Sequence, residues 1–115
     1  TIFIGETMQR YHDTTYIVSG NMGGHITGGT IDIGAMKTVS FVCDSSAATS
    51  PDGHLRIQVS NDNSVWAESG TNVELTGTAT KSVVNGTDIG SRYVRLYFDR
   101  DSGSGANLNV SVHAC

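Results

Sequence analysis

The stretch LRIQVSNDNSVW, residues 55–66, decides the fold of this 115-residue chain. Its apolar side chains Leu55, Ile57 and Val59 alternate with polar ones, and a cluster of Asn and Asp residues then precedes Trp66. Successive side chains of a β-strand point to opposite faces, so this alternation predicts a strand with one face in a core and the other toward water. For Trp66 we predict a place at one end of the core.

The same period of two returns in SRYVRLYF, residues 91–98. Its apolar side chains share one strand face, which we assign to the core: Val94, Leu96 and Phe98. The opposite face carries a polar and aromatic stripe: Tyr93, Arg95 and Tyr97. Tyrosine and arginine are favoured at binding surfaces, so the stripe suits stacking on sugar rings or the centre of a protein interface. Ordinary cross-strand packing of the guanidinium over the rings explains it equally well.

Further strands are predicted on both sides of these two stretches. The clearest cover residues 37–43 and 107–114, and weaker ones cover 25–32, 65–68, 72–76 and 81–84. Turn signals stand at residues 51–53 (Pro-Asp-Gly) and 85–86 (Asn-Gly), and residues 99–107 read as a flexible loop. The composition, with 14 glycines and only 16% charged residues, is also typical of an all-β protein. The expected fold is all-β: an antiparallel β-sandwich, jelly-roll-like, of seven or eight strands.

The N-terminal part of the chain lacks a sustained period. Residues 1–24 contain short β-prone pieces around a polar segment and end in a glycine-rich loop. We predict an N-terminal arm or edge segment over residues 1–24, packed on its own domain or on a neighbour. The sandwich domain then occupies residues 25–115.

Charge and hydropathy exclude two classes of partner. Seven basic residues stand against 11 acidic ones, for a net charge of −4, and the basic residues are mostly scattered singly. Nucleic-acid binding usually needs a basic patch that neutralises phosphates, so we expect no nucleic acid. No apolar run approaches the ~20 residues that span a bilayer, so we expect no membrane insertion.

No motif for catalysis, a metal or a cofactor stands out. The chain has no nucleophile elbow and no recognisable pair of catalytic carboxylates. His113 and Cys115 share one strand face, but two ligands alone are too few for a structural zinc site. We therefore expect no enzyme, no metal and no cofactor. Cys43 is on the same face of its predicted strand as the apolar side chains, which suits a small buried residue. A disulfide between Cys43 and Cys115 stays open, although a chain with only two cysteines favours free thiols.

The order of these pieces resembles the small β-sandwich virion proteins of tailed bacteriophages. In those proteins a strand ending in a pattern like "QxSNDG", a nearby Trp and a later "RYVRL" strand recur. Residues 58–62 (QVSND), Trp66 and residues 92–96 (RYVRL) carry the resemblance, with Asn63 in place of the usual Gly. The resemblance covers about three-quarters of the chain. It implies a head decoration (cement) protein or a domain of a fibre or tail component.

A weaker resemblance links the same motifs to discoidin-like (F5/8 type C) sandwiches. Those proteins carry "SNDGxxW" and "ARYIRL", but they are longer and close a disulfide between their two ends, whereas Cys43 is internal here. This resemblance implies a carbohydrate-binding module in which the stripe, with Asp62 or Asp99, contacts sugar.

The reading that these observations favour is a non-enzymatic capsid decoration protein, bound to the phage major capsid protein and to copies of itself. Its place would be the virion, assembled in the host cytoplasm. The alternatives are the carbohydrate-binding module, with a surface glycan as partner, and an extracellular filament subunit joined by strand donation. The residues predicted to form interfaces come from the N-terminal segment and the stripe: Ile2, Phe3, Ile4, Tyr11, Tyr16, Ile17, Tyr93, Arg95 and Tyr97.

Overall fold

The computed structural model describes residues 10–46, 51–76, 79–87, 89–103 and 107–115. Over these residues the chain is all-β, which confirms the predicted class, and no helix in this part is long and apolar enough to cross a membrane. The strands are β1 (Tyr11–Asn21), β2 (Ile26–Thr27), β3 (Ile31–Asp32), β4 (Val39–Ser46), β5 (Pro51–Ser60), β6 (Ala67–Thr76), β7 (Ala79–Gly86), β8 (Tyr93–Gly103) and β9 (Asn107–Ala114).

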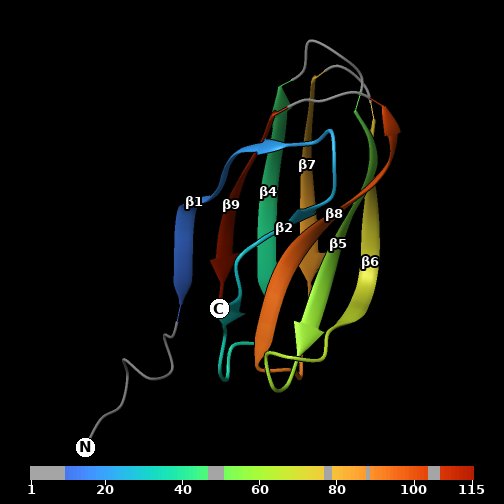
Figure 1. Cartoon of the computed structure of the whole chain (residues 1–115). Helices are drawn as coiled ribbons and strands as arrows, with labels where there is room; N and C mark the ends of the chain where they lie inside the picture. Colours follow the sequence, from blue (N-terminus) through green and yellow to red (C-terminus); the bar gives the residue numbers. More distant parts are fainter. Residues whose placement is uncertain (1–9, 47–50, 77–78, 88, 104–106) are drawn as a thin grey trace, which may run out of the picture.

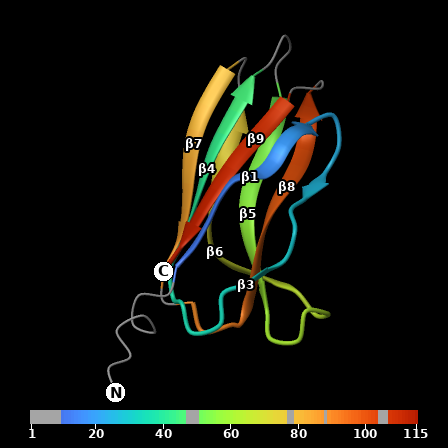
Figure 2. The ribbon, with the colours of Figure 1, turned by 90° about the vertical axis from the view of Figure 1, so that its left-hand side faces the viewer.

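These strands form two antiparallel sheets that pack into a sandwich. The first sheet has the order β1-β9-β4-β7, and the second has the order β2-β8-β5-β6, with β3 also paired to β8. The strands of both layers run roughly along the length of the molecule, and β1 lies at the outer edge of its sheet (Figures 1 and 2). The described residues form nine strands where seven or eight were predicted. The expected strand over residues 25–32 is split into β2 and β3 and the N-terminal segment adds β1, while the two strands expected over residues 65–68 and 72–76 are one, β6.

The core lies between the two sheets and follows the predicted alternation. Phe41, Leu55, Val94 and Leu96 each expose 0% of their surface. The buried hydrophobic residues are Met22, Ile31, Ile33, Val39, Phe41, Cys43, Leu55, Ile57, Val84, Ile89, Val94, Leu96, Phe98, Leu108, Val110, Val112 and Ala114. Burial of these side chains is the main stabilising term of the fold.

Both predicted turns are wrong. Their glycines belong to strands, where the lack of a side chain allows neighbouring residues to pack closely. Residues 51–53 open β5, and a Cβ on Gly53 would lie 2.5 Å from the backbone oxygen of Asp99 on the paired strand β8. Residues 85–86 end β7, where a Cβ on Gly86 would lie 3.0 Å from Ile89. Glycine is needed at both places since any side chain would meet a neighbour.

Two strands are also longer than predicted. β6 is continuous over Ala67–Thr76, where two separate strands were expected, and it pairs with β5 across one register shift. β8 continues to Gly103, which pairs with Pro51, where a loop had been expected from residue 99. The extension places Asp99 and Asp101 on a strand, beside residues of β5.

The described part of the N-terminal segment belongs to the sandwich. β1 pairs with β9, its residues Tyr11, Tyr16 and Ile17 pack against the core, and Met22 is fully buried. Ile2, Phe3 and Ile4 lie outside the described residues. The arm over residues 1–24 as a contact with other subunits stays a prediction.

The hydroxyl of Tyr16 reaches from the first sheet into the second. It accepts a hydrogen bond from the backbone N–H of Leu96 (3.1 Å) and donates one to the carbonyl of Gly29 (2.5 Å). Leu96 lies between the β8 residues that pair with β2 and with β3, so its N–H faces the gap between those two short strands. Burial raises the pKa of Tyr16 to about 12, so the hydroxyl keeps its proton at neutral pH. Tyr16 thus supplies the hydrogen bond that the interrupted edge lacks.

The two cysteines are free, as predicted, and they differ in reactivity. Cys43 is buried and Cys115 is exposed. Burial raises the pKa of the Cys43 thiol from 9.0 to about 12, which leaves almost no thiolate to react.

We expect iodoacetamide at pH 8 to alkylate Cys115 in the native protein and to reach Cys43 only after unfolding. Intact mass spectrometry would show one adduct before denaturant and two after it. The unfolded chain ionises Cys43 near pH 9 while the folded chain keeps the proton to about pH 12, so stability is lost as the pH rises between these values. Two adducts at equal rates on the folded chain would contradict the buried position.

Candidate functional site: the outer face of the second sheet

The outward-pointing side chains of β5 and β8 form one continuous surface, which we call the β5–β8 face. The antiparallel register sets Gln58 opposite Arg95, Arg56 opposite Tyr97, and His54 opposite Asp99. Neighbouring side chains from β6, from the turn before it and from the segment before β2 complete the face. Its members are His25, His54, Arg56, Gln58, Trp66, Glu68, Glu74, Tyr93, Arg95, Tyr97, Asp99 and Asp101.

Trp66 lies on this face, not at the end of the core as predicted. The guanidinium carbon of Arg95 lies 4.1 Å from the centroid of the Trp66 ring, and Arg95 Nε donates a hydrogen bond of 2.7 Å to Gln58 Oε1. The guanidinium is thereby fixed between an indole and an amide, which favours a cation–π contact. Trp66 itself is half-buried.

The turn before Trp66 explains its position. The Asp62 carboxylate accepts hydrogen bonds of 2.9 Å from the backbone N–H groups of Ser64 and Val65, and Asn63 adopts φ +59°. The Val65 and Ser64 N–H groups hold the pKa of Asp62 below its ordinary value. Asp62 therefore holds the turn that places Trp66 over β8.

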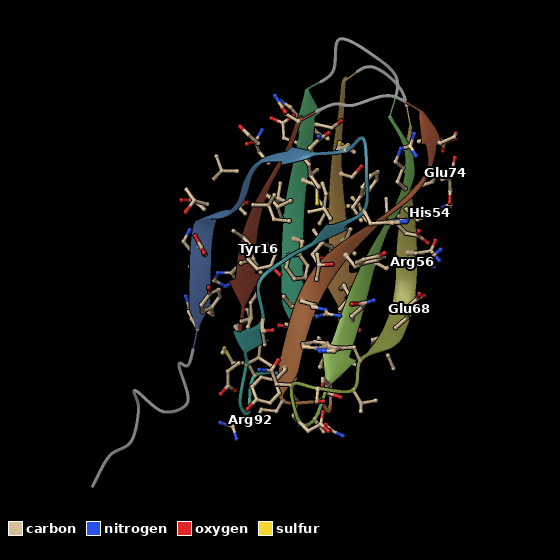
Figure 3. The ribbon with its side chains drawn as sticks, viewed as in Figure 1. Tyr16, His54, Arg56, Glu68, Glu74 and Arg92 are labelled. Atoms are coloured by element: carbon tan, nitrogen blue, oxygen red, sulfur yellow. The ribbon has the colours of Figure 1, made fainter. Side chains whose placement is uncertain are left out.

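Arg56 is at the centre of a group of charges on the face (Figure 3). Its Nη1 lies 3.0 Å from Glu68 Oε1 and its Nε lies 3.4 Å from Asp99 Oδ2, and only 21% of its side chain is exposed. Glu68 accepts a charge-assisted hydrogen bond from this half-buried guanidinium, and such bonds are stronger than neutral ones. Asp99 lies at ion-pair distance and accepts no hydrogen bond from Nε.

His54 has carboxylates on two sides. Its Nδ1 lies 2.9 Å from Asp101 Oδ2, and its Nε2 lies 3.7 Å from Glu74 Oε2. Figure 3 shows His54 and Glu74 on neighbouring strands of this sheet. The 2.9 Å contact with Asp101 does not have hydrogen-bond geometry. Asp101 is on the continuation of β8 that sequence patterns had assigned to a loop.

His25 stacks on Tyr97 at the other side of β8. Their ring centroids are 5.9 Å apart and the rings are inclined by 16°. His25 Nδ1 accepts a hydrogen bond of 3.1 Å from the backbone N–H of Arg100. Because that nitrogen accepts this hydrogen bond, it does not donate to Asp99, whose Oδ1 lies 3.4 Å away.

Tyr93 is at the end of the face nearest the Asp32–Arg92 ion pair. The guanidinium carbon of Arg92 lies 5.2 Å from the Tyr93 ring centroid, while Arg92 Nη2 donates to Asp32 Oδ2 at 2.9 Å. Hydrogen bonding to Arg92 lowers the pKa of Asp32.

The structure brings together the three stripe residues and separates them from the rest of the predicted interface set. Tyr93, Arg95 and Tyr97 share the β5–β8 face as predicted. The first-sheet residues Tyr11, Tyr16 and Ile17 pack toward the core instead. Of the two aspartates suggested for sugar contact, Asp99 is on the face and Asp62 belongs to the turn.

The members of the face on β5 were not singled out as site residues from the sequence. The polar side of the alternation in this strand carries His54, Arg56 and Gln58, and that alternation was the signal that could have found them. Among the described residues, no group of three or more His, Cys, Asp or Glu side chains is arranged to hold a metal. The absence of enzymatic activity stays a prediction.

The β5–β8 face extends along two long paired strands. Two surface hollows, of about 400 and 300 Å³, are lined by residues at the end of the sandwich that holds Asp32, Ser60 and Arg92. The aromatic members of the face, Trp66 and Tyr97 among them, line neither hollow. The arrangement is suited to contact with a surface rather than to enclosure of a small molecule.

Comparison with known proteins assigns the chain to no family. No family model matches it, and no curated protein matches it. A solved structure described as "CBM4 structure and function" is similar over 76% of this chain, with 17% identity and a TM-score of 0.48. The chain spans 56% of the length of that structure.

Proposed function

We propose that this chain is a non-enzymatic structural protein of a bacteriophage particle, a capsid decoration protein that docks on shell subunits through the β5–β8 face. The sequence resemblance to the small β-sandwich virion proteins of tailed bacteriophages supports a place in the phage particle. The single structural observation that supports docking is the stack of Trp66, Arg95 and Gln58 at one end of that face. In this proposal the protein acts in the virion, is assembled in the host cytoplasm, and performs no chemistry.

The residue types on the face are those that dominate protein interfaces. Trp, Tyr and Arg supply most binding hot spots, and the face presents Trp66, Tyr93, Tyr97 and Arg95. Arg95 and Arg56 are already held by partners within the chain, so little side-chain freedom is left to lose on binding. A pre-ordered, nearly flat surface fits another protein surface well.

A sugar-binding module is the second candidate, favoured by the presence of three rings beside hydrogen-bonding side chains. Stacking on a sugar needs a bare ring face, however, and a partner already takes up one face of each ring. Arg95 lies over Trp66, His25 over Tyr97 and Arg92 beside Tyr93. These contacts favour the protein partner over the glycan.

Contacts between copies of the chain remain part of the proposal through Ile2, Phe3 and Ile4. Because β1 begins at Tyr11 and contributes Tyr16 to the packing, a deletion that removes the arm while keeping the sandwich must stop at residue 9.

We expect Trp66→Ala to weaken binding to capsids of the encoding phage assembled without this protein by about 30-fold, the loss of a ~2 kcal/mol hot spot. Arg95→Ala is expected to have a similar effect because it removes the partner of the ring. Lys81→Ala, an exposed cation on β7 of the first sheet, is the matched control and should bind within about twofold of the wild type. Co-sedimentation with capsids at increasing protein concentration gives the affinities.

Equal binding by all three variants would remove the face from the proposal. A chain that ignores capsids but binds a glycan array, with loss of that binding in Trp66→Ala, would establish the sugar-binding module instead.

A further inference from the structure

The first sheet carries a pair of histidines that the docking proposal does not use. His12 on β1 and His113 on β9 are directly opposite in the antiparallel register, and both are exposed. Their ring centroids are 5.8 Å apart and the rings meet edge to face. Side chains opposite each other on neighbouring strands are close enough to act together. We infer that His12 and His113 form a binding site for a divalent transition metal ion of the Cu²⁺, Ni²⁺ or Zn²⁺ type.

The geometry is within reach of chelation. An ion bound to two imidazole nitrogens at about 2.0–2.1 Å each holds the ring centroids roughly 5 Å apart in tetrahedral geometry. The observed 5.8 Å requires only a small rotation of exposed side chains. Imidazole is a preferred ligand of these ions, and water fills the remaining positions, so the site is open and exchangeable.

Position along the strands selects this pair from the four histidines. His54 has carboxylates at ion-pair distance on two sides, and His25 accepts a hydrogen bond from the backbone of Arg100 and stacks on Tyr97. His12 and His113 are in ring contact, and within the part of the chain that the structure describes neither has a carboxylate at ion-pair distance.

Metal binding here would fasten the edge strand β1. β1 pairs only with β9, and its register shifts between Asp13 and Ile17 and again between Ile17 and Gly20. The pairing is in regular register from Tyr11 to Asp13. An ion that joins His12 to His113 adds a link between β1 and β9 at this regular end. The two ligands are about a hundred residues apart in sequence, so folding is what brings them together, and the metal stabilises the folded chain.

The test is thermal unfolding and calorimetric titration of the tag-free full chain with CuCl2, NiCl2 and ZnCl2. We expect each ion to raise the denaturation midpoint and to bind with a 1:1 stoichiometry, most tightly for Cu²⁺. MgCl2 and CaCl2, which prefer oxygen ligands, should have no effect. Binding should weaken in acidic buffer, because protonated imidazole cannot act as a ligand.

Three variants decide the assignment. His12→Ala and His113→Ala should each lower the affinity for Ni²⁺ at least tenfold and abolish the rise of the midpoint. His25→Ala removes an exposed histidine from the other sheet and should bind as the wild type does. Titrations that are flat for the wild type, or that are unchanged in the double variant lacking His12 and His113, would overturn the inference.

Discussion

Leu96→Ala is expected to lower the free energy of unfolding by about 2–5 kcal/mol, the range found for truncation of a buried leucine. Leu96 exposes 0% of its surface and belongs to β8, which pairs with β5 on one side and with β2 and β3 on the other. The surrounding strands are held by this pairing and cannot collapse fully into the space left behind. The cost is therefore the lost transfer of the side chain plus a cavity.

Chemical denaturation followed by Trp66 fluorescence measures this loss. Val83→Ala is the control, because Val83 belongs to a strand of the other sheet and exposes 50% of its surface, so it should change stability by less than about 0.5 kcal/mol. If Leu96→Ala fails to fold, Ile57→Val on β5 tests the same core at an expected cost of about 0.5–1.5 kcal/mol. Equal midpoints for wild type, Leu96→Ala and Ile57→Val would mean that these side chains do not face the core.

The strands with a strict period of two were the predictable part of the fold. The alternation around Leu55 and around Leu96 correctly assigned the inner faces of β5 and β8, because burial of one strand face favours an apolar side chain at every second residue. That same alternation assigned the outer face, including Arg95. Local pattern was sufficient wherever one side of a strand meets the core and the other meets water.

Turn signals failed where glycine has a second use. Gly53 and Gly86 stand in sequences typical of tight turns, yet both belong to strands where a neighbouring atom occupies the space of a Cβ. A sequence shows that a position tolerates no side chain without showing whether dihedral angle or crowding is the reason.

The contacts of the β5–β8 face could not be predicted, because they depend on register. Arg56 meets Asp99, 43 residues later, only because the register of β5 and β8 sets His54 opposite Asp99. Trp66 was predicted to lie at one end of the core, but the turn held by Asp62 places it beside Arg95. The sequence offers each partner separately, and the non-local pairing of strands brings them together.

Tyr16→Phe is expected to lower the free energy of unfolding by about 1–3 kcal/mol, the cost of leaving a buried polar group unpaired. The hydroxyl is the partner of the Leu96 N–H at the gap between β2 and β3, and water cannot easily replace it beside a fully buried residue. Gly29 is exposed, so its carbonyl can turn to solvent and adds little. The ring itself still packs near Phe41, with centroids 5.4 Å apart, so the substitution removes the hydrogen bonds and keeps the packing.

Tyr93→Phe is the matched control, since it removes a tyrosine hydroxyl from β8, the strand that holds Leu96, without breaking a hydrogen bond found among the described residues, and it should be nearly neutral. Gly28→Ala disturbs the same contact between Tyr16 and the second sheet, because a Cβ on Gly28 would collide with the Tyr16 ring and hydroxyl. If the Tyr16 hydroxyl joins the two sheets, both Tyr16→Phe and Gly28→Ala should speed hydrogen exchange at the Leu96 amide, while Tyr93→Phe should leave it protected. An unchanged exchange rate at Leu96 in Tyr16→Phe would show that the edge between β2 and β3 is closed by something other than this side chain.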